Sequence, residues 1–262
     1  MTRRFASVVL LSVLTSAAGA QRTDFHWEKA LPAGNQVSIS NINGDITVLP
    51  STTGKVEVVG VKRGTGNLDR IRADVQQSSR GIAVCVLRDD DSYCDDRGTH
   101  TNNRGDRSNH DWNDVRMDLE ISVPMNLQVS ANAVSGNISM TGATGDVTAS
   151  TVSGDVKLDR LRASSVNAGS VSGNVEVSIQ EFTGRGDLSF HSVSGDITLD
   201  LPRQLDADLS MSTVSGGINS DFAMTLGDSR MDRRSVRATI GKGGRRLDFS
   251  TVSGSVKLRS AR

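Results

Sequence analysis

The chain has 262 residues, enough for one large domain or two modest ones. Its 30 basic and 30 acidic residues balance, which gives no electrostatic case for binding nucleic acid or an acidic membrane. Aromatic residues make up only 3% of the chain, and Gly, Ser, Val, Asp and Thr abound. This composition is typical of many short strands and turns and excludes a helical bundle.

Residues 1–20 have the pattern of a signal peptide. Arg3 and Arg4 precede an apolar stretch over residues 5–14, and Ala18-Gly19-Ala20 fits a cleavage site of small residues. No other apolar run approaches the ~20 residues that a membrane span needs. We therefore expect an exported chain, in the periplasm or at the cell surface, with no membrane span once the signal peptide is removed.

Residues 21–123 predict an N-terminal β region. Strands are indicated at 37–48, with a bend at Gly44, and at 55–62, 71–75 and 81–87. The last strand, 115–123, alternates apolar and polar residues without a break and ends at Pro124, which cannot continue a hydrogen-bonded ladder.

The segment 88–114 differs in composition from the rest. It holds eight Asp residues and almost nothing apolar, which predicts a long exposed loop. Its carboxylates could bind Ca²⁺, and His100 and His110 a transition metal, but the ligand spacings of known sites are absent. We therefore expect a solvated loop and no metal site.

Cys85 and Cys94 are the only cysteines of the chain. In an exported protein such a pair predicts a disulfide, which here would clamp the base of the polar loop. The alternative is two free thiols, with Cys85 buried in its strand.

Residues 124–262 are built from a repeat whose clearest copy is Thr-Val-Ser-Gly-Asp-Val at 151–156. The repeat glycines, including an upstream copy at 41–46, are Gly44, Gly136, Gly154, Gly173, Gly195, Gly216 and Gly254. From Gly136 onward they are spaced by 18, 19, 22, 21 and 38 residues. A spacing near 20 predicts the coils of a β-solenoid, with 38 interpreted as two coils, the second a degenerate one around 236–240.

The positions around each glycine predict how the backbone turns. Apolar residues lie seven and five residues before the glycine, Val or Ile lies two before and two after, and an apolar residue usually lies four after. The apolar residues at the seventh and fifth positions before the glycine are at odd offsets, and the others are at even offsets. Because a strand alternates its faces residue by residue, both sets can face one core only if the strand switches faces once. We expect that switch between the fifth and the second residue before the glycine, with the Val inward. The glycine would mark a close backbone approach, and the following residue would point outward. A β-sandwich of the same strands is the alternative architecture.

Asp45, Asp155 and Asp196 follow three of the glycines, and carboxylates on one face of a β-helix are typical of polysaccharide-cleaving enzymes. The equivalent positions elsewhere are Asn137, Asn174, Gly217 and Ser255, an interchange that turns accept. No catalytic or phosphate-binding motif is present. The sequence therefore predicts no catalytic, cofactor-binding or metal-binding residue.

Three features together carry a family resemblance: Val-Ser-Ile-Ser-Asn-Ile-Asn-Gly-Asp-Ile at 37–46, a strand containing Val-Cys at 84–85, and serial Val-Ser-Gly-Asp/Asn units closed by Gly-Gly-Arg-Arg-Leu-Asp-Phe-Ser-Thr-Val-Ser-Gly at 243–254. This combination resembles the bacterial exported β-strand-repeat proteins of unknown function that are often labelled adhesins. The resemblance implies a β-rich fold and export, and it brings no catalytic residues.

The sequence thus predicts a non-enzymatic, adhesin-like scaffold that binds an unidentified protein or glycan of the cell envelope or surface. A carbohydrate-active β-helix enzyme and an envelope-stress or partner-binding protein that uses a sheet edge are the alternatives.

Overall fold

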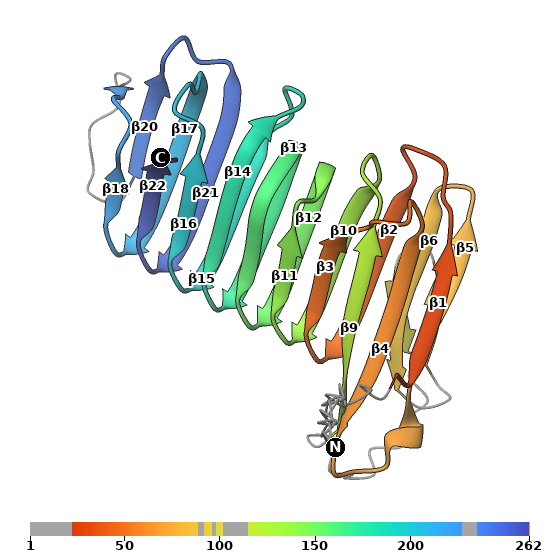
Figure 1. Ribbon diagram of the computed structural model, residues 1–262. Helices are drawn as coiled ribbons and strands as arrows, with labels where there is room; N and C mark the ends of the chain where they lie inside the picture. The colour runs from red at the N-terminus through yellow and green to blue at the C-terminus, as the bar shows by residue number, and fades with distance from the viewer. Residues whose placement is uncertain (1–22, 89–91, 96–97, 102–114, 227–234, 262) are drawn as a thin grey trace, which may run out of the picture.

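The computed structural model of the protein describes residues 23–88, 92–95, 98–101, 115–226 and 235–261. These residues are all-β apart from one short 3₁₀ turn, η1 (Leu68–Arg70). Within them, twenty strands join one large mixed sheet and two more form a separate hairpin. The sheet folds into an elongated stack, with the first strands at one end and the last repeats at the other (Figure 1). The expected signal peptide, residues 1–20, lies outside the described residues.

The stack has two rows of parallel strands that meet at a corner, and each repeat adds one strand to each row. Row A contains, in spatial order, β2 (Gln36–Asn43), β10 (Gln128–Ser135), β12 (Thr144–Ser153), the second half of β13 (Val156–Ser172), β15 (Leu188–Ser194), β21 (Arg245–Ser253) and β17 (Ala207–Ser215). Row B contains β3 (Ile46–Pro50), β11 (Ile138–Thr141), the first half of β13, β14 (Val175–Phe182), β16 (Ile197–Leu201), β22 (Val256–Ser260) and β18 (Ile218–Ser220).

Equivalent residues of neighbouring repeats lie side by side, as Val129 beside Val147 and Ala131 beside Ala149 do. The residues seven and five before each glycine point inward from row A, and those two after it point inward from row B. Both sets belong to one continuous core that runs through the whole stack, including its N-terminal strands. Each fully buried Val or Leu contributes about 1.5–3 kcal/mol, so neighbouring repeats stabilise one another.

The spatial order of the repeats differs from their order in the sequence. The last repeat, β21 and β22, lies between β15/β16 and β17/β18. The expected degenerate coil around 236–240 is wrong, because β20 (Ser235–Ile240) runs antiparallel to β17 and pairs on its other side with the short strand β19 (Thr225–Leu226). The long spacing before Gly254 therefore contains the antiparallel pair of β19 and β20, and β20 covers the edge of β17 at the C-terminal end of row A.

Antiparallel strands also close the N-terminal end. β6 (Gly81–Arg88) and β9 (Val115–Val123) extend rows A and B by one more parallel strand each. Beyond them, β5 (Ile71–Ser78) pairs antiparallel with β6, and β4 (Val56–Gly64) pairs antiparallel with β9 and with β1 (Phe25–Lys29). The upstream repeat around Gly44 thus stacks directly on the repeat of Gly136, between the two ends.

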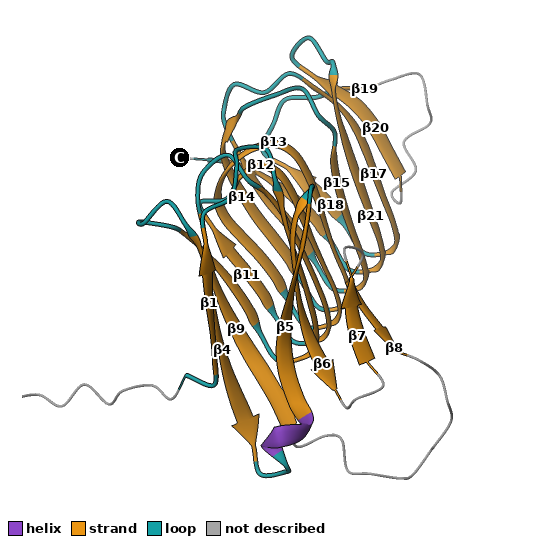
Figure 2. Cartoon of the chain, turned by 90° about the vertical axis from the view of Figure 1, so that its right-hand side faces the viewer, coloured by secondary structure: helices purple, strands orange, loops and turns teal. Residues whose placement is uncertain are grey.

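A hairpin of β7 (Ser92–Asp95) and β8 (Gly98–Thr101) lies against the outer surface of β6 (Figure 2). The prediction of an exposed loop throughout 88–114 is therefore wrong for these eight residues. They fold because Ala83, Cys85 and Leu87 point outward from β6 and pack with Cys94 in a second small core. The other residues between Arg88 and Val115, His110 among them, lie outside the described part of the chain. No helix in the described ranges is long and apolar enough to cross a membrane.

Candidate interaction surface

The repeat glycines form a column at the corner between the rows. The backbone of Gly154 has φ +146°, and a Cβ atom there would lie 2.2 Å from the carbonyl oxygen of Gly136. The same approach joins each glycine to the next, with Gly254 above Gly195 and Gly216 above Gly254. Only glycine allows the coils to stack this closely, which explains its presence in every copy.

The carbonyl group of a repeat glycine points into the interior, where a side chain of the next repeat donates a hydrogen bond to it. The residue three before the glycine is a buried Ser or Thr in five repeats: Thr151, Ser170, Ser192, Thr213 and Thr251. The hydroxyl of Thr151 donates to the carbonyl of Gly136 at 3.0 Å, and that of Ser170 to Gly154 at 2.8 Å. These hydroxyls are a structural device that sequence reasoning missed, because their acceptors belong to another repeat.

Asn41 donates hydrogen bonds to the first two backbone carbonyls of this column. Its buried amide donates both to the carbonyl of Met117, which stands at the glycine position of β9, at 2.8 Å and to that of Gly44 at 3.0 Å. The equivalent residue of the next repeat is Ala133, which has no donor. The two N–H groups of one Asn therefore satisfy two buried carbonyls and make a hydroxyl at the next position unnecessary.

The Val two residues before each glycine points outward, so the prediction that it faces the core is wrong. Because the residue three before the glycine is buried and the two residues directly before the glycine are exposed, the switch of faces occurs later than expected, between the third residue before the glycine and the second residue after it. These side chains are 44–58% exposed. We call them the valine column, which in spatial order is Val134, Val152, Val171, Val193, Val252 and Val214.

The residues that follow the glycines point outward on row B, as expected, and form a hydrogen-bonded ladder. The carboxylate of Asp45 accepts the backbone N–H of Asn137 at 2.8 Å, and the amide oxygen of Asn137 accepts that of Asp155 at 2.9 Å. The ladder continues through Asn174, Asp196 and Ser255. Because Asp alternates with Asn or Ser, two charged rungs are never neighbours among these six, which limits like-charge repulsion.

Asp196 shows what this ladder does to a carboxylate. A hydrogen bond from the backbone of Ser255 lowers its pKa, and Lys257 at 3.0 Å lowers it further. The carboxylates considered above for catalysis are therefore engaged in holding successive coils together. Within the described ranges no group of three or more His, Cys, Asp or Glu side chains could hold a metal ion.

The outer surface of row A has a different character. Its outward positions six and four before the glycines carry small uncharged residues over five neighbouring strands, with His191 as the one titratable exception. We call this surface, together with the valine column, the row-A face. Its outward residues are Ser38, Ser40, Ser130, Asn132, Thr148, Ser150, Asn167, Gly169, Ser189 and His191.

The β7–β8 hairpin borders the row-A face at its N-terminal end. A disulfide joins Cys85 of β6 to Cys94 of β7, with the two Cα atoms 5.8 Å apart, and fixes the hairpin to the stack. Beside the hairpin is an open groove of about 410 Å³, lined by Thr99 of β8 and by residues of β2 and β10 that include Asn132 and Val134. On the outer side of the hairpin, the half-exposed ring of Tyr93 stacks on His100.

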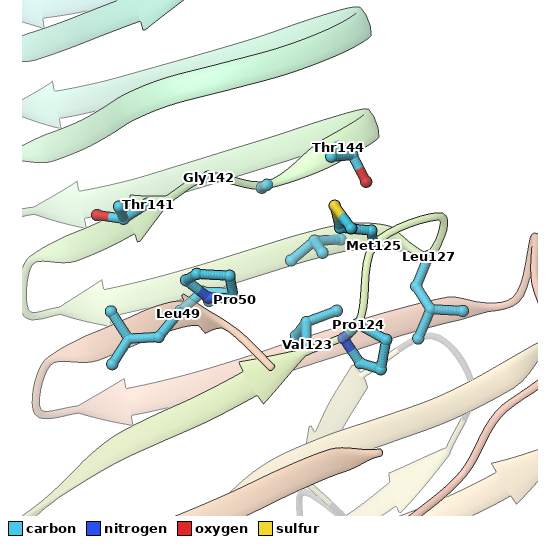
Figure 3. A pocket seen from close by; sticks show the side chains of 12 residues that line it. Leu49, Pro50, Val123, Pro124, Met125, Leu127, Thr141, Gly142 and Thr144 are labelled. Atoms are coloured by element: carbon cyan, nitrogen blue, oxygen red, sulfur yellow. The ribbon is translucent and has the colours of Figure 1, made fainter. Parts of the chain in front are cut away.

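Two further hollows lie at the opposite ends of the strands. A slit of about 10 Å³ lies among Pro50, Pro124 and Met125 and has room for at most one water molecule (Figure 3). An open groove of about 440 Å³ continues from it past Asp146 and Arg162. Both charges are engaged, since Asp146 accepts the hydroxyl of Ser165 and Arg162 pairs with Glu181.

Comparisons with known proteins identify a family and similar solved structures. Residues 35–259 match the family described as Toastrack DUF4097. The chain belongs to this family. Among solved structures it is similar to a putative cell adhesion protein from Clostridium sporogenes ATCC 15579, with a TM-score of 0.50 and 10% identity over 90% of this chain and 99% of that one. It is also similar to a putative adhesin from Bacteroides fragilis NCTC 9343, with a TM-score of 0.42 and 15% identity over 89% and 96% of the two chains. The search of curated proteins gave no match.

Membership of the Toastrack DUF4097 family confirms the resemblance stated from the repeat motif. The Clostridium structure, at this identity, bears on the fold and not on the ligand. Arg245 is a structural feature that the motif does not reveal: its guanidinium lies 4.3 Å from the ring centre of Phe182 and donates to the carbonyls of Ser164, Gly184 and Gly186. Burial lowers its pKa, and these contacts hold the loop between β14 and β15 in place.

Proposed function

We propose that this Toastrack chain is a non-enzymatic scaffold outside the cytoplasm, a rigid β-solenoid of ~20-residue coils that acts in adhesion or partner binding. Its interaction surface is the row-A face, and its ligand is a protein or glycan of the cell envelope or surface.

The observation that carries this proposal is the contrast between the two outer surfaces. On row B the Asp and Asn side chains accept backbone N–H groups of the neighbouring coil, so their hydrogen-bonding capacity serves the fold. On row A the side chains of Ser130, Thr148 and Asn167 make no hydrogen bond to any described part of the chain. Their donors and acceptors face solvent in rows about 4.8 Å apart.

Such an array suits a ligand that makes many weak contacts. Hydroxyl and amide groups bind the hydroxyls of a glycan or the main chain of an extended peptide equally well, and the valine column adds an apolar border. Each contact is worth about 0.5–1.5 kcal/mol, so affinity depends on the number of rungs engaged. The stack supplies these rungs in fixed positions, which lowers the entropy cost of binding.

The Cys85–Cys94 disulfide supports a location outside the cytoplasm, because cytoplasmic thiols are kept reduced. It also supports a role for the hairpin that it fixes, since that hairpin forms one wall of the groove at the end of the row-A face.

The test measures binding of purified residues 21–262 to isolated cell envelopes of the source bacterium. The double variant Thr148→Arg/Asn167→Arg places two charges on the row-A face, and the matched control Thr47→Arg/Ser139→Arg places two on row B. We expect saturable binding that the first variant weakens at least tenfold and the control leaves unchanged. Binding that responds equally to both variants, or no saturable binding, would contradict the proposal.

The enzyme alternative is tested in the same samples. Incubation of the chain with the envelope glycans should leave the number of reducing ends constant. A time-dependent increase that is abolished by Asp155→Asn/Asp196→Asn would assign these carboxylates a catalytic role and overturn the scaffold proposal.

A further inference from the structure

We propose that the ligand of the row-A face is a second copy of this chain, so that the protein binds itself through its valine column. The inference rests on the proposed function for the choice of face and goes beyond it by naming the partner.

The valine column is the main exposed apolar feature of the described part of the chain. Its six side chains account for six of the nine large apolar side chains that are exposed among the described residues. They lie on adjacent rungs, so they form one unbroken stripe rather than scattered positions. Contiguous exposed apolar stripes of this kind are typical of protein–protein interfaces.

The spacing of the valine column favours a second copy of this chain as the partner. Rungs of stacked strands are about 4.8 Å apart, whereas alternate residues of one strand are about 6.7 Å apart and successive turns of a helix about 5.4 Å apart. A single extended peptide therefore loses register with the stripe after one or two rungs, and a single helix after about four. A second stack of strands keeps register over all of them, and this chain presents a valine stripe with that spacing.

The charge of the face also favours a second copy. At the positions six and four residues before the glycines, the first five strands of row A carry no carboxylate, Lys or Arg, and His191 is their one titratable group. Over the remaining two strands Asp248 is the one fixed charge at these positions, and in an antiparallel pair its strand lies opposite β10, which carries Ser130 and Asn132. Asp146 lies two residues farther from the valine column than Thr148, outside these positions. Two copies related by a two-fold axis thus bring no fixed like charges together. The ladder of Asp45, Asp155 and Asp196 lies on row B, beyond the corner, and does not face its own copy.

The area is sufficient for a weak dimer. The valine column extends the contact beyond the five strands of small uncharged residues to β21 and β17, which carry Val252 and Val214. The seven strands of row A span about 29 Å, and the five residues from the outermost outward position to the valine column span about 16 Å. Two such faces bury on the order of 1,000 Å² in total, which is the lower limit of specific interfaces. We therefore expect a reversible dimer with a dissociation constant in the micromolar range.

A two-fold axis through the middle of the stripe gives a sharp test. The first strand of row A carries the half-buried Ile42 beside Val134, at the position of the valines. Val171 is therefore the central rung of the seven strands from β2 to β17, and in a dimer with its two-fold axis at this strand it lies beside the Val171 of the other copy. Under mild oxidation, Val171→Cys should form a disulfide-linked dimer, whereas Val214→Cys, at one end, and Ser139→Cys, on row B, should stay monomeric. Cys85 and Cys94 do not interfere, because they are already joined to each other.

Sedimentation equilibrium of residues 21–262 complements the cross-linking. We expect a concentration-dependent dimer that Val152→Asp/Val171→Asp weakens at least tenfold and that Thr47→Asp/Ser139→Asp leaves unchanged, with circular dichroism confirming that all variants are folded. A monomer at all concentrations up to about 100 µM, or equal cross-linking of the three cysteine variants, overturns the inference. If envelope binding through the row-A face persists in a monomeric chain, the proposed function stands and the ligand is a different molecule.

Discussion

Phe190 and Phe249 stack in the core with ring centroids 5.4 Å apart, although the repeat of Gly216 separates theirs in the sequence. They are direct neighbours because β21 lies between β15 and β17, which places Met211 on the far side of Phe249. Both rings are almost fully buried, whereas the same position holds Ala131, Ala149 and Ala168 in the earlier repeats. The pairing of these two rings thus marks the point where the last repeat enters the stack.

Phe190→Ala should destabilise the chain by about 3–5 kcal/mol, and Ala149→Gly, at the same position of an earlier repeat, by about 1 kcal/mol. A double-mutant cycle should give a coupling of about 0.5–1.5 kcal/mol between Phe190 and Phe249, and none above error between Phe190 and Met211. Urea unfolding measures both. Coupling of Phe190 to Met211 instead would place the repeats in sequence order and contradict the structure.

Gly154→Ala should be strongly destabilising, since the positive φ alone costs about 1–3 kcal/mol and the added Cβ also meets the carbonyl of Gly136. Gly217→Ala is the matched control, because no atom lies within 4 Å of a Cβ at that glycine. Thermal unfolding should show a loss of several degrees for the first variant and little change for the second. Similar losses for both would argue against a special role of the repeat glycine.

Thr151→Val keeps the shape of the side chain but removes the donor to the buried carbonyl of Gly136, which should cost about 1–3 kcal/mol. Asn41→Leu should cost more, because it leaves the carbonyls of Met117 and Gly44 unsatisfied together. Ser153→Ala, on the exposed side of the same strand, should change stability by less than about 0.5 kcal/mol. Chemical denaturation gives the free energy of unfolding of each variant. Equal losses for Thr151→Val and Ser153→Ala would contradict the hydrogen bonds from the buried hydroxyls to the glycine carbonyls.

The contribution of Asp196 should depend on pH. Its pKa is lowered in the folded chain, so its stabilising effect is complete above the ordinary Asp pKa of about 3.9 and is lost as the pH falls through the lower folded value. At pH 7, Asp196→Asn should cost less than about 1 kcal/mol, because the pair with Lys257 is screened by solvent. Urea titrations at pH 7 and pH 3 should show this difference shrinking at the lower pH; a difference that grows would contradict the sign.

The repeat pattern was sufficient to predict the all-β class and the alignment of equivalent residues in neighbouring repeats, and together with the segments at 37–46 and 84–85 it indicated the family. Because every repeat has the same pattern, any order of stacking satisfies it equally. Contacts between particular side chains distinguish the order found, such as Phe190 with Phe249 and Asp196 with Lys257. The hydroxyl of Thr151 looks like an exposed group in sequence, and its burial follows from an acceptor that exists only once the coils are stacked.

The row-A face could not be predicted as a candidate site, because its apolar border consists of Val152 and the equivalent valines, which the sequence pattern places in the core. Periodicity within a single strand assigns an apolar residue at an alternating position to the buried face. The grooves beside Asn132 and Asp146 join segments that are distant in sequence, and no local motif announces them.

The central claim is that the row-A face is the interaction surface, and protection of engineered cysteines tests it most directly. Thr148→Cys on row A and Ser139→Cys on row B replace half-exposed hydroxyl residues of similar burial in adjacent coils. Maleimide labelling of each is followed with and without isolated envelopes, and again at low and high protein concentration. The account predicts that labelling of Thr148→Cys slows when the partner is present while that of Ser139→Cys is unchanged. Protection of Ser139→Cys alone, or of neither position under conditions where the chain is bound, would contradict it.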